Sequence, residues 1–414
     1  MLLRYLLILL FSLHLFAIDA SMKIEKDVEH RSRIALMDGS EVSNGKLFKI
    51  LLSDFKISGH FLADTALHKG DFSGSFIAPG LKSKEYVLKY RFSSINGAKL
   101  EIRLLKASDG TQIFEKSYAI KNSKKMPFLV HKAVYDINRI LKYPDIGWIN
   151  RYVVFSRYTT PKHSEILLAD YTFTYQKVII RGGLNLFPKW ADKAQKSFYY
   201  TSYAGLVPTL NKINIYNGSK RKVASSEGMI VCSDVSADGG KILLTMSPEG
   251  QADIYEMSLF TGSKKRVTKF NGVDVGGKYL GNESQIVFVS NRLGYANIFK
   301  KSINSPAVSQ VVFHGRNNNA VDAHGNTIVY ASRESSNAFG GNRFNLYLTS
   351  VNGGSTRPLT TTGSNQFPRF STDGSVILYI KQRGGSSSVG YINLGSSQSL
   401  LFPLGGRKIQ SIDW

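Results

Sequence analysis

The sequence has little cysteine and few acidic residues, and both shortages restrict what the protein can be. Cys232 is the one cysteine among 414 residues, which excludes an internal disulfide. Because Cys232 lies in a strand-like run, we expect it in the core rather than at a reactive site. Asp and Glu number 30 against 53 Lys and Arg, so the formal net charge is +23. Such a charge favours anionic partners.

The positive charges are spread along the chain, with only short clusters such as Lys220–Lys222 and Lys264–Arg266. A nucleic-acid-binding face normally gathers its basic residues on one stripe. We therefore interpret the charge as a basic solvated surface and expect no nucleic-acid partner.

Long apolar runs are also missing, with one exception near the N-terminus. The run from Tyr5 to Ala17 spans about 13 residues, which is too short to cross a bilayer but has the length of a signal-peptide core. Small Ala20 offers a cleavage position after it, so we expect a signal peptide at 1–20 and Ser21 as the first mature residue. The mature chain should then be exported to the periplasm and carry no transmembrane segment.

The stretch 21–145 mixes helix and strand patterns and predicts a small α/β domain. A short strand is expected at 33–37, and Leu47, Ile50, Leu51 and Phe55 then recur at helical spacing. Further strands are expected at 86–92, 99–105 and 112–120. Pro127 favours the start of a second helix, where its missing N–H costs nothing. The domain should therefore contain one sheet and at least two helices.

From residue 147 onward the chain repeats one pattern six times. Apolar triplets occur at 153–155, 198–200, 242–244, 286–288, 328–330 and 377–379. They are about 44 residues apart, the span of a four-stranded propeller blade. In the middle four repeats an Asp/Asn–aliphatic–aromatic triplet is expected to lie in the third strand, at 214–216, 253–255, 297–299 and 345–347. An all-β sandwich would have to produce this spacing by accident, so we predict a six-bladed β-propeller over 147–414.

The two ends of the repeat region predict how the blades of the propeller close into a ring. Residues 367–381 show the repeat most clearly, as two strand-like runs around the turn at Asp373-Gly374. The first repeat lacks such a first strand, whereas the last residues, 408–414, look like one. The C-terminal strand should therefore complete the first blade, which removes the open sheet edges.

The whole chain resembles the TolB family of the Tol-Pal cell-envelope system. The resemblance rests on the signal peptide, the small α/β domain and the six repeats, best matched at 235–241, 289–299 and 367–374. Residues 191–194, 281–284 and 323–326 depart from the usual Asp-Gly turn. The resemblance implies a non-catalytic periplasmic adaptor that supports outer-membrane integrity and envelope constriction during cell division.

The same resemblance implies two partners and leaves room for other outer-membrane proteins. The lipoprotein Pal would bind at the mouth of the propeller channel, in loops rich in Asn, Gln, Ser and Arg that suit hydrogen bonding to a partner. The candidate residues there are Glu227, Asn291, Arg292, Asn317, Asn318, Arg333, Asn365 and Gln366. The C-terminal domain of TolA would bind the N-terminal segment, with Met22, Lys23, Ile24 and Glu25 as candidates. That segment is suited to adding a strand to a partner's sheet, or it is an ordinary frayed terminus.

Two other classes of function stay open at this point. A propeller glycosidase or lyase would need carboxylates that meet in the channel, and Asp234, Asp322 and Glu334 are candidates, although each suits a turn or a hydrogen bond. A propeller that binds anionic glycan or lipopolysaccharide would suit the net charge. The sequence shows no nucleophile elbow, metal cluster or phosphate-binding glycine loop, so we expect no enzyme activity, metal or cofactor. We expect His131 to be a surface or packing residue.

Overall fold

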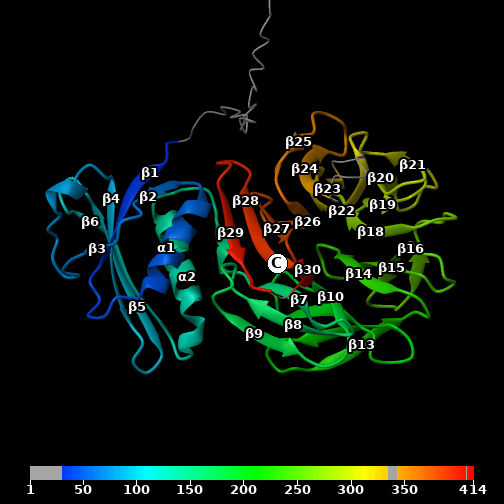
Figure 1. The fold of residues 1–414 in the computed structure, drawn as a ribbon, viewed down its shortest axis with the longest axis horizontal. Coiled ribbons are helices and arrows are strands. Elements are labelled where there is room, and N and C mark those ends of the chain that lie inside the picture. The colour runs from blue at the N-terminus through cyan, green and yellow to red at the C-terminus, as the bar shows by residue number, and fades with distance from the viewer. Residues whose placement is uncertain (1–29, 334–342, 407) are drawn as a thin grey trace, which may run out of the picture.

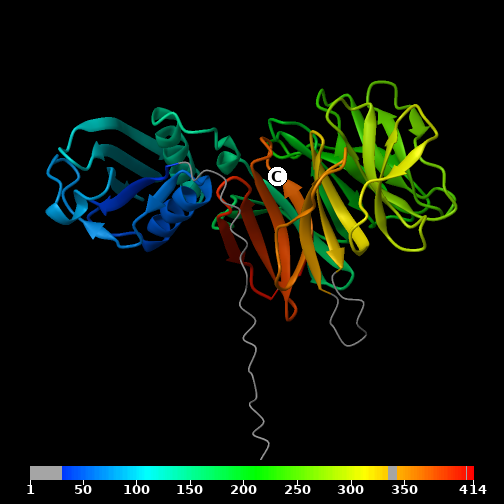
Figure 2. The ribbon, with the colours of Figure 1, turned by 90° about the horizontal axis from the view of Figure 1, so that it is seen from above.

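The computed structural model describes residues 30–333, 343–406 and 408–414. It has two parts, an N-terminal α/β domain and a ring of six four-stranded sheets, which lie side by side in Figures 1 and 2. The predicted fold class, an α/β domain followed by a six-bladed β-propeller, is confirmed.

The N-terminal domain is built on one mixed sheet. Its strands are β1 (Ser32–Asp38), β2 (Phe61–Ala63), β3 (His68–Lys69), β4 (Tyr86–Ser93), β5 (Ala98–Lys106) and β6 (Gln112–Ile120). The order is β2-β1-β4-β5-β6, with β3 also paired to β1. β1 runs parallel to β2 and β4, whereas β4, β5 and β6 form an antiparallel meander.

Two helices cover this sheet on the side that faces the propeller (Figure 1). Helix α1 (Gly45–Ser58) begins at Asn44, whose side chain accepts hydrogen bonds from the N–H groups of Lys46 and Leu47, and it ends at Gly59 with φ of 82°. Helix α2 (Met126–Ile140) has Pro127 in its first turn, as predicted. Short 3-10 turns lie at Pro79–Leu81, Ser123–Lys125 and Gly147–Asn150.

The propeller strands follow the predicted repeat. Blade one contains β30 (Ile409–Asp413), β7 (Val153–Thr160), β8 (His163–Ala169) and β9 (Gln176–Ile180); blade two contains β10 (Asn185–Trp190), β11 (Ser197–Ser202), β12 (Thr209–Asn214) and β13 (Lys220–Ser225); blade three contains β14 (Ile230–Val235), β15 (Lys241–Met246), β16 (Asp253–Ser258) and β17 (Lys264–Arg266). Blade four contains β18 (Asp274–Tyr279), β19 (Gln285–Ser290), β20 (Asn297–Ser302) and β21 (Val308–Gln310); blade five contains β22 (Arg316–His324), β23 (Thr327–Arg333), β24 (Phe344–Ser350) and β25 (Arg357–Pro358); blade six contains β26 (Ser364–Phe370), β27 (Val376–Arg383), β28 (Ser386–Asn393) and β29 (Ser399–Pro403). Every predicted apolar triplet lies in a second strand and is buried.

The ring closes as the sequence predicted. The C-terminal strand β30 pairs antiparallel with β7, and Ile412 lies opposite Phe155. The indole Nε1 of Trp414 also donates to the carbonyl of Phe370 in blade six, 2.7 Å away. The last residues therefore connect the sixth blade to the first.

One predicted register is wrong, in blade two. The triplet 214–216 was expected to lie in the third strand, but β12 ends at Asn214. The position that matches Asp253 of blade three is Thr209, because Thr209 lies opposite Ser202 as Asp253 lies opposite Met246. Thr209 thus stands where blades three to five have Asp or Asn, and the triplet at 214–216, which resembles theirs, begins only at the end of the strand.

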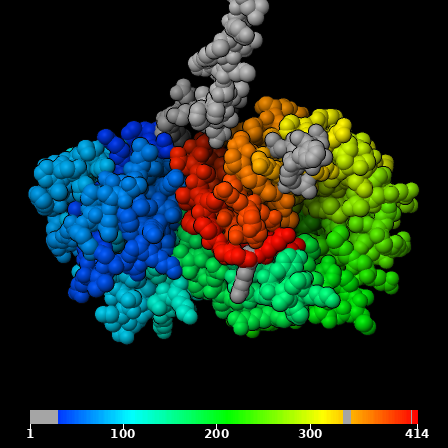
Figure 3. Space-filling model, in the orientation of Figure 1, coloured from blue at the N-terminus to red at the C-terminus, as the bar shows by residue number. Residues whose placement is uncertain are grey.

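One buried apolar cluster contains residues of both domains and joins them. Leu51 of α1 and Val134 of α2 belong to the same buried cluster as Phe155 of blade one and Tyr391 of blade six. In Figure 3 the blue N-terminal residues accordingly lie directly beside the red last blade. Cys232 is buried, as expected.

Candidate functional site at the propeller channel

Strands in each blade are antiparallel, so the loops lie at two opposite ends of the propeller. The loops from second to third strands, and those entering each first strand, share one end, which we call the mouth face. The eight residues predicted to bind Pal lie in or beside these loops, and they differ in how far they are exposed to solvent. Glu227 and Asn291 are exposed, and Asn317 and Gln366 are half-buried.

Arg292 is held inside blade four instead of projecting from it. Its guanidinium donates to the buried carboxylate of Asp274 at 3.0 Å and to the Ser290 hydroxyl at 2.9 Å. It also lies over the rings of Phe270 and Phe299, each 5.0 Å away. Arg292 therefore anchors the loop between β19 and β20, and an effect of its substitution on binding would be indirect.

Asn318 and Asn365 are fully buried, and the NH2 group of each side chain donates within the chain, whereas the Oδ1 atoms have no hydrogen-bond partner among the described residues. Asn318 donates to Asn297 Oδ1 at 2.9 Å, and Asn365 donates to Asn345 Oδ1 at 3.1 Å. Each bond joins the first strand of one blade to the third strand of the blade before it. These residues fix the mouth loops, and sequence alone gave no sign that they point inward.

Other predicted residues lie at the limits of what the structure describes. Arg333 is half-buried at the end of β23. Glu334 and the N-terminal candidates Met22, Lys23, Ile24 and Glu25 lie outside the described residues, as does the expected signal peptide. Contact with a partner stays a prediction for Arg333 and for the four N-terminal candidates.

Sequence reasoning missed an arc of exposed apolar side chains on the mouth face, which we call the apolar arc. It consists of Leu206, Val207, Val273, Leu293 and Phe313. Leu206 is fully exposed and Phe313 is 80% exposed. Buried interface centres are richer in such residues than ordinary surface is, so the arc is a better candidate for a contact surface than the buried asparagines. These residues are scattered over four loops, one or two in each, so the sequence shows no pattern that joins them.

The first strands line the channel and carry a ring of alternating charge. In blade order from one to six, the residues are Asp413, Lys189, Asp234, Lys278, Asp322 and Arg369. Each lies opposite the middle residue of its blade's apolar triplet, for example Lys189 opposite Tyr199 and Asp234 opposite Leu243. The six strands surround the centre of the propeller in Figure 1. We call this set the channel ring.

The ring's ion pairs join neighbouring blades. Lys278 Nζ lies 3.0 Å from Asp322 and 3.9 Å from Asp234, and Lys189 Nζ lies 3.1 Å from Asp413 and 3.5 Å from Asp234. Arg369 Nε lies 3.8 Å from Asp413. Three cations face three carboxylates, so the ring has no net charge.

Each carboxylate of the ring also accepts a backbone hydrogen bond from the following blade. The donors are the N–H groups of Trp190 to Asp413, Tyr279 to Asp234 and Phe370 to Asp322, at 2.9, 3.0 and 2.9 Å. The blades are thereby joined in three pairs, one–two, three–four and five–six. A buried carboxylate held by a cation and a backbone donor is well satisfied.

The pKa values of two lysines of the ring are shifted in opposite directions. Burial alone lowers the pKa of Lys189, but Asp413 and Asp234 outweigh it and the pKa is raised. At Lys278 burial dominates over the attraction of Asp322, and the pKa is lowered. Burial raises the pKa of Asp322, but Lys278 and Arg369 reverse this and the pKa is lowered.

This arrangement does not suit a glycosidase. Such an enzyme needs two carboxyl groups that flank a sugar bond, one of them protonated. Asp234 and Asp322 do meet the channel, but each faces a lysine and a backbone donor. Within the part of the chain that the structure describes, no group of three or more His, Cys, Asp and Glu side chains is placed to hold a metal ion.

Comparison with known proteins decides the family. Residues 148–414 match the family model described as the TolB beta propeller domain. The chain is 44% identical to the Tol-Pal system protein TolB of Wolinella succinogenes, over 97% of both chains, and 41% identical to that of Helicobacter hepaticus, over 99% of both. The chain belongs to the TolB family. Membership identifies it as a non-catalytic protein, as the sequence led us to expect.

The TolB fold extends over both domains. A crystal structure of TolB from Acinetobacter baumannii aligns with a TM-score of 0.76 and 20% identity, covering 93% of this chain and 97% of that one. At this identity the likeness shows the fold alone. No helix among the described residues of this TolB-family chain is long and apolar enough to span a membrane.

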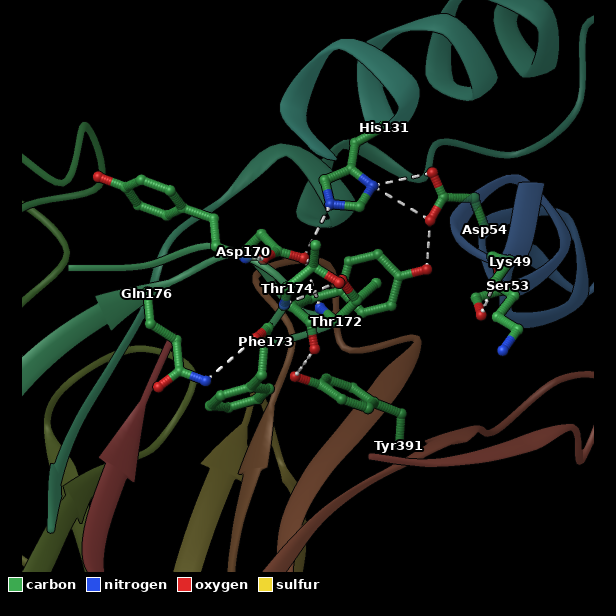
Figure 4. A network of polar contacts seen from close by, with 12 residues as sticks. Lys49, Ser53, Asp54, His131, Asp170, Thr172, Phe173, Thr174, Gln176 and Tyr391 are labelled. Carbon is green, nitrogen blue, oxygen red and sulfur yellow. Dashed lines mark hydrogen bonds and ion pairs between the residues drawn. The ribbon is translucent and has the colours of Figure 1, made fainter. Parts of the chain in front are cut away.

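The two domains of this TolB-family chain are joined by a buried polar network (Figure 4). His131 of α2 lies between two carboxylates, with Nδ1 2.8 Å from Asp54 of α1 and Nε2 3.3 Å from Asp170 of blade one. Tyr171 donates its hydroxyl to Asp54, and Tyr391 of blade six donates to the Tyr171 carbonyl at 2.8 Å. His131 is therefore a packing residue, but one that holds an ion pair across the domain junction.

The protonated form of His131 is favoured in this network. Burial lowers the pKa of the imidazole, but Asp54 and Asp170 outweigh it and raise the pKa to about 9. Asn393 of blade six supports the same junction by donating to the carbonyl of Ile57 at the end of α1, 3.0 Å away. No pattern in the sequence pointed to this network, because its members come from four separate elements.

Proposed function

We propose that this chain is a non-catalytic adaptor of the Tol-Pal system in the periplasm. In this role it binds Pal through the mouth face and the C-terminal domain of TolA through its N-terminal segment. By joining these partners it supports outer-membrane integrity and envelope constriction during division. The observation that supports this most strongly is the similarity, over nearly the whole chain, to relatives named as Tol-Pal system proteins.

The surface chemistry of the mouth face is consistent with protein binding. It presents the apolar arc together with exposed polar groups at Glu227 and Asn291, which is the composition of a protein–protein interface with an apolar centre and a polar rim. The loops are held from beneath by Arg292, Asn318 and Asn365, so the surface is pre-organised.

The test for Pal is calorimetric titration of the mature protein with the periplasmic domain of Pal. We expect saturable binding that weakens in the double variant Leu206→Ser/Phe313→Ser. Each buried apolar side chain contributes roughly 1.5–3 kcal/mol, so the loss should be at least tenfold. The control is Phe260→Ser, which removes another exposed ring from the opposite end of the propeller. Absence of binding by the folded wild-type protein would refute the Pal assignment.

The test for TolA uses the N-terminal segment. Replacing Ile24 with Asp in the mature chain should abolish binding of the TolA C-terminal domain in a pull-down, because a charge would disrupt an added strand, and leave Pal binding unchanged. Retention of TolA binding in this variant would place the TolA site elsewhere on the chain.

A further inference from the structure

The turns between third and fourth strands in blades two and three carry the same exposed pattern. Each turn presents an aromatic ring, Tyr216 at 71% exposure in blade two and Phe260 at 98% in blade three. Each ring is followed by three basic residues at the start of the outermost strand, 220–222 in β13 and 264–266 in β17. We call the set Tyr216, Lys220, Arg221, Lys222, Phe260, Lys264 and Lys265 the basic rim.

The cations of the basic rim are not neutralised within the chain. Arg266 is paired with Asp253, but Lys220, Arg221, Lys222, Lys264 and Lys265 form no ion pair with any carboxylate of the described residues. Fourth strands elsewhere lack this composition; β21 of blade four, for example, reads Val-Ser-Gln. The positive charge is thus concentrated at the edge of two adjacent blades, where β13 lies on the outside of the ring in Figure 1.

A neighbouring turn of blade two extends the positive surface around Tyr216. The N–H of Ile215 donates to the carbonyl of Lys196 at 3.0 Å, so the turn of blade two that contains exposed Lys193 and Lys196 lies beside Tyr216. Tyr216 is therefore flanked by the exposed lysines of two turns of blade two.

We propose that the basic rim binds the surface of a lipid bilayer that contains anionic headgroups. Exposed aromatic side chains at loop tips partition to the headgroup level of a membrane, and lysine and arginine beside them are attracted to lipid phosphate. Tyr216 and Phe260 lie on equivalent turns of two adjacent blades, at the same end of the propeller, so one flat surface can contact both. The mouth face lies at the other end of the propeller, so the proposal goes beyond the adaptor function and does not depend on it.

Flotation of the mature protein with vesicles tests the proposal. We expect binding to phosphatidylcholine vesicles that contain about a quarter phosphatidylglycerol, weak binding to phosphatidylcholine alone, and release in about 1 M salt, where the screening length falls to roughly 3 Å. The variant Lys220→Gln/Lys222→Gln/Lys264→Gln should reduce partitioning on the order of 100-fold. The control Lys46→Gln/Lys82→Gln/Lys106→Gln removes the same charge from exposed lysines of the N-terminal domain and should bind almost as the wild type does.

A second variant locates the contact without removing any charge. Phe260→Trp should shift its fluorescence to shorter wavelength on the anionic vesicles and not on the neutral ones. Equal loss of binding in both triple variants would contradict the proposal, because net charge alone would then explain binding. Binding to soluble polyglutamate with none to vesicles would also overturn it, in favour of an acidic polymer or protein as the ligand.

Discussion

The channel ring and the basic rim use the same side chains, lysine and arginine, in opposite ways. In the ring, Lys189, Lys278 and Arg369 alternate with three aspartates and the charge sums to zero. On the rim, five cations stand without a carboxylate partner. One region lies inside the propeller and the other on its outer edge.

Solvent access explains the difference. A cation removed from water must be matched by a carboxylate at close range, or it destabilises the fold by several kcal/mol. An exposed cation keeps its hydration and contributes almost nothing to stability. The ring therefore stabilises the fold and joins the blades, whereas the rim stays free to attract an anionic surface.

The largest effect is expected from breaking the ring. Asp322→Asn keeps an oxygen for the N–H of Phe370 but leaves buried Lys278 without its 3.0 Å partner. We expect a loss of about 3–5 kcal/mol in the free energy of unfolding, measured in urea. Adding Lys278→Met should recover most of it. Equal stability of Asp322→Asn and the wild type would show that the ring contributes nothing.

The second-largest effect is expected at the domain junction, which should weaken as the pH is raised. The folded-state pKa of His131 is raised to about 9, above the usual 6.5, so its stabilising contribution is complete below pH 6.5 and is lost as the pH rises toward 9. The loss should approach about 3 kcal/mol across this window. The groups that face the imidazole are Asp54, Asp170 and Tyr171. His131→Gln should show a flatter dependence; an unchanged slope would mean that another group titrates.

A smaller effect is expected at Arg292. Arg292→Ala removes the partner of buried Asp274 and the cation over three rings, so the free energy of unfolding should fall by about 2 kcal/mol. Arg292→Lys keeps the charge, so its free energy of unfolding should lie between those of Arg292→Ala and the wild type. If Arg292→Ala weakened Pal binding without any loss of stability, Arg292 would contact the partner directly.

The smallest effect is expected on the rim. The triple variant Lys220→Gln/Lys222→Gln/Lys264→Gln should unfold within about 0.5 kcal/mol of the wild type, because these lysines are exposed and form no ion pair with the described residues. Thermal unfolding in low salt measures it. A clear loss of stability would show that the rim is structural and would remove the contrast with the ring.

Much of the fold could be predicted because each blade repeats a local pattern. The apolar triplets and Asp-Gly turns depend on neighbours along the chain, and the closing strand is indicated by a first strand missing at one end and present at the other. The prediction of the third strand was wrong in blade two, because Thr209 replaces the usual Asp or Asn and a similar triplet follows at 214–216.

The site was harder to predict because its geometry depends on contacts between blades. Asn318 and Asn365 have the composition of binding residues, but their direction is set by Asn297 and Asn345 of the preceding blade. The alternation of the channel ring was present in the sequence, one residue per repeat, yet it has meaning only once the six first strands are known to face one another.

The most direct test of the proposed adaptor function is hydrogen exchange of the mature protein with and without the periplasmic domain of Pal. We expect slower exchange in the mouth loops, at 203–208, 291–296 and 313–319, and unchanged exchange at 215–222 and 259–266 on the rim. Protection confined to the rim, or no protection at saturating Pal, would contradict the assignment of the mouth face as the partner-binding surface.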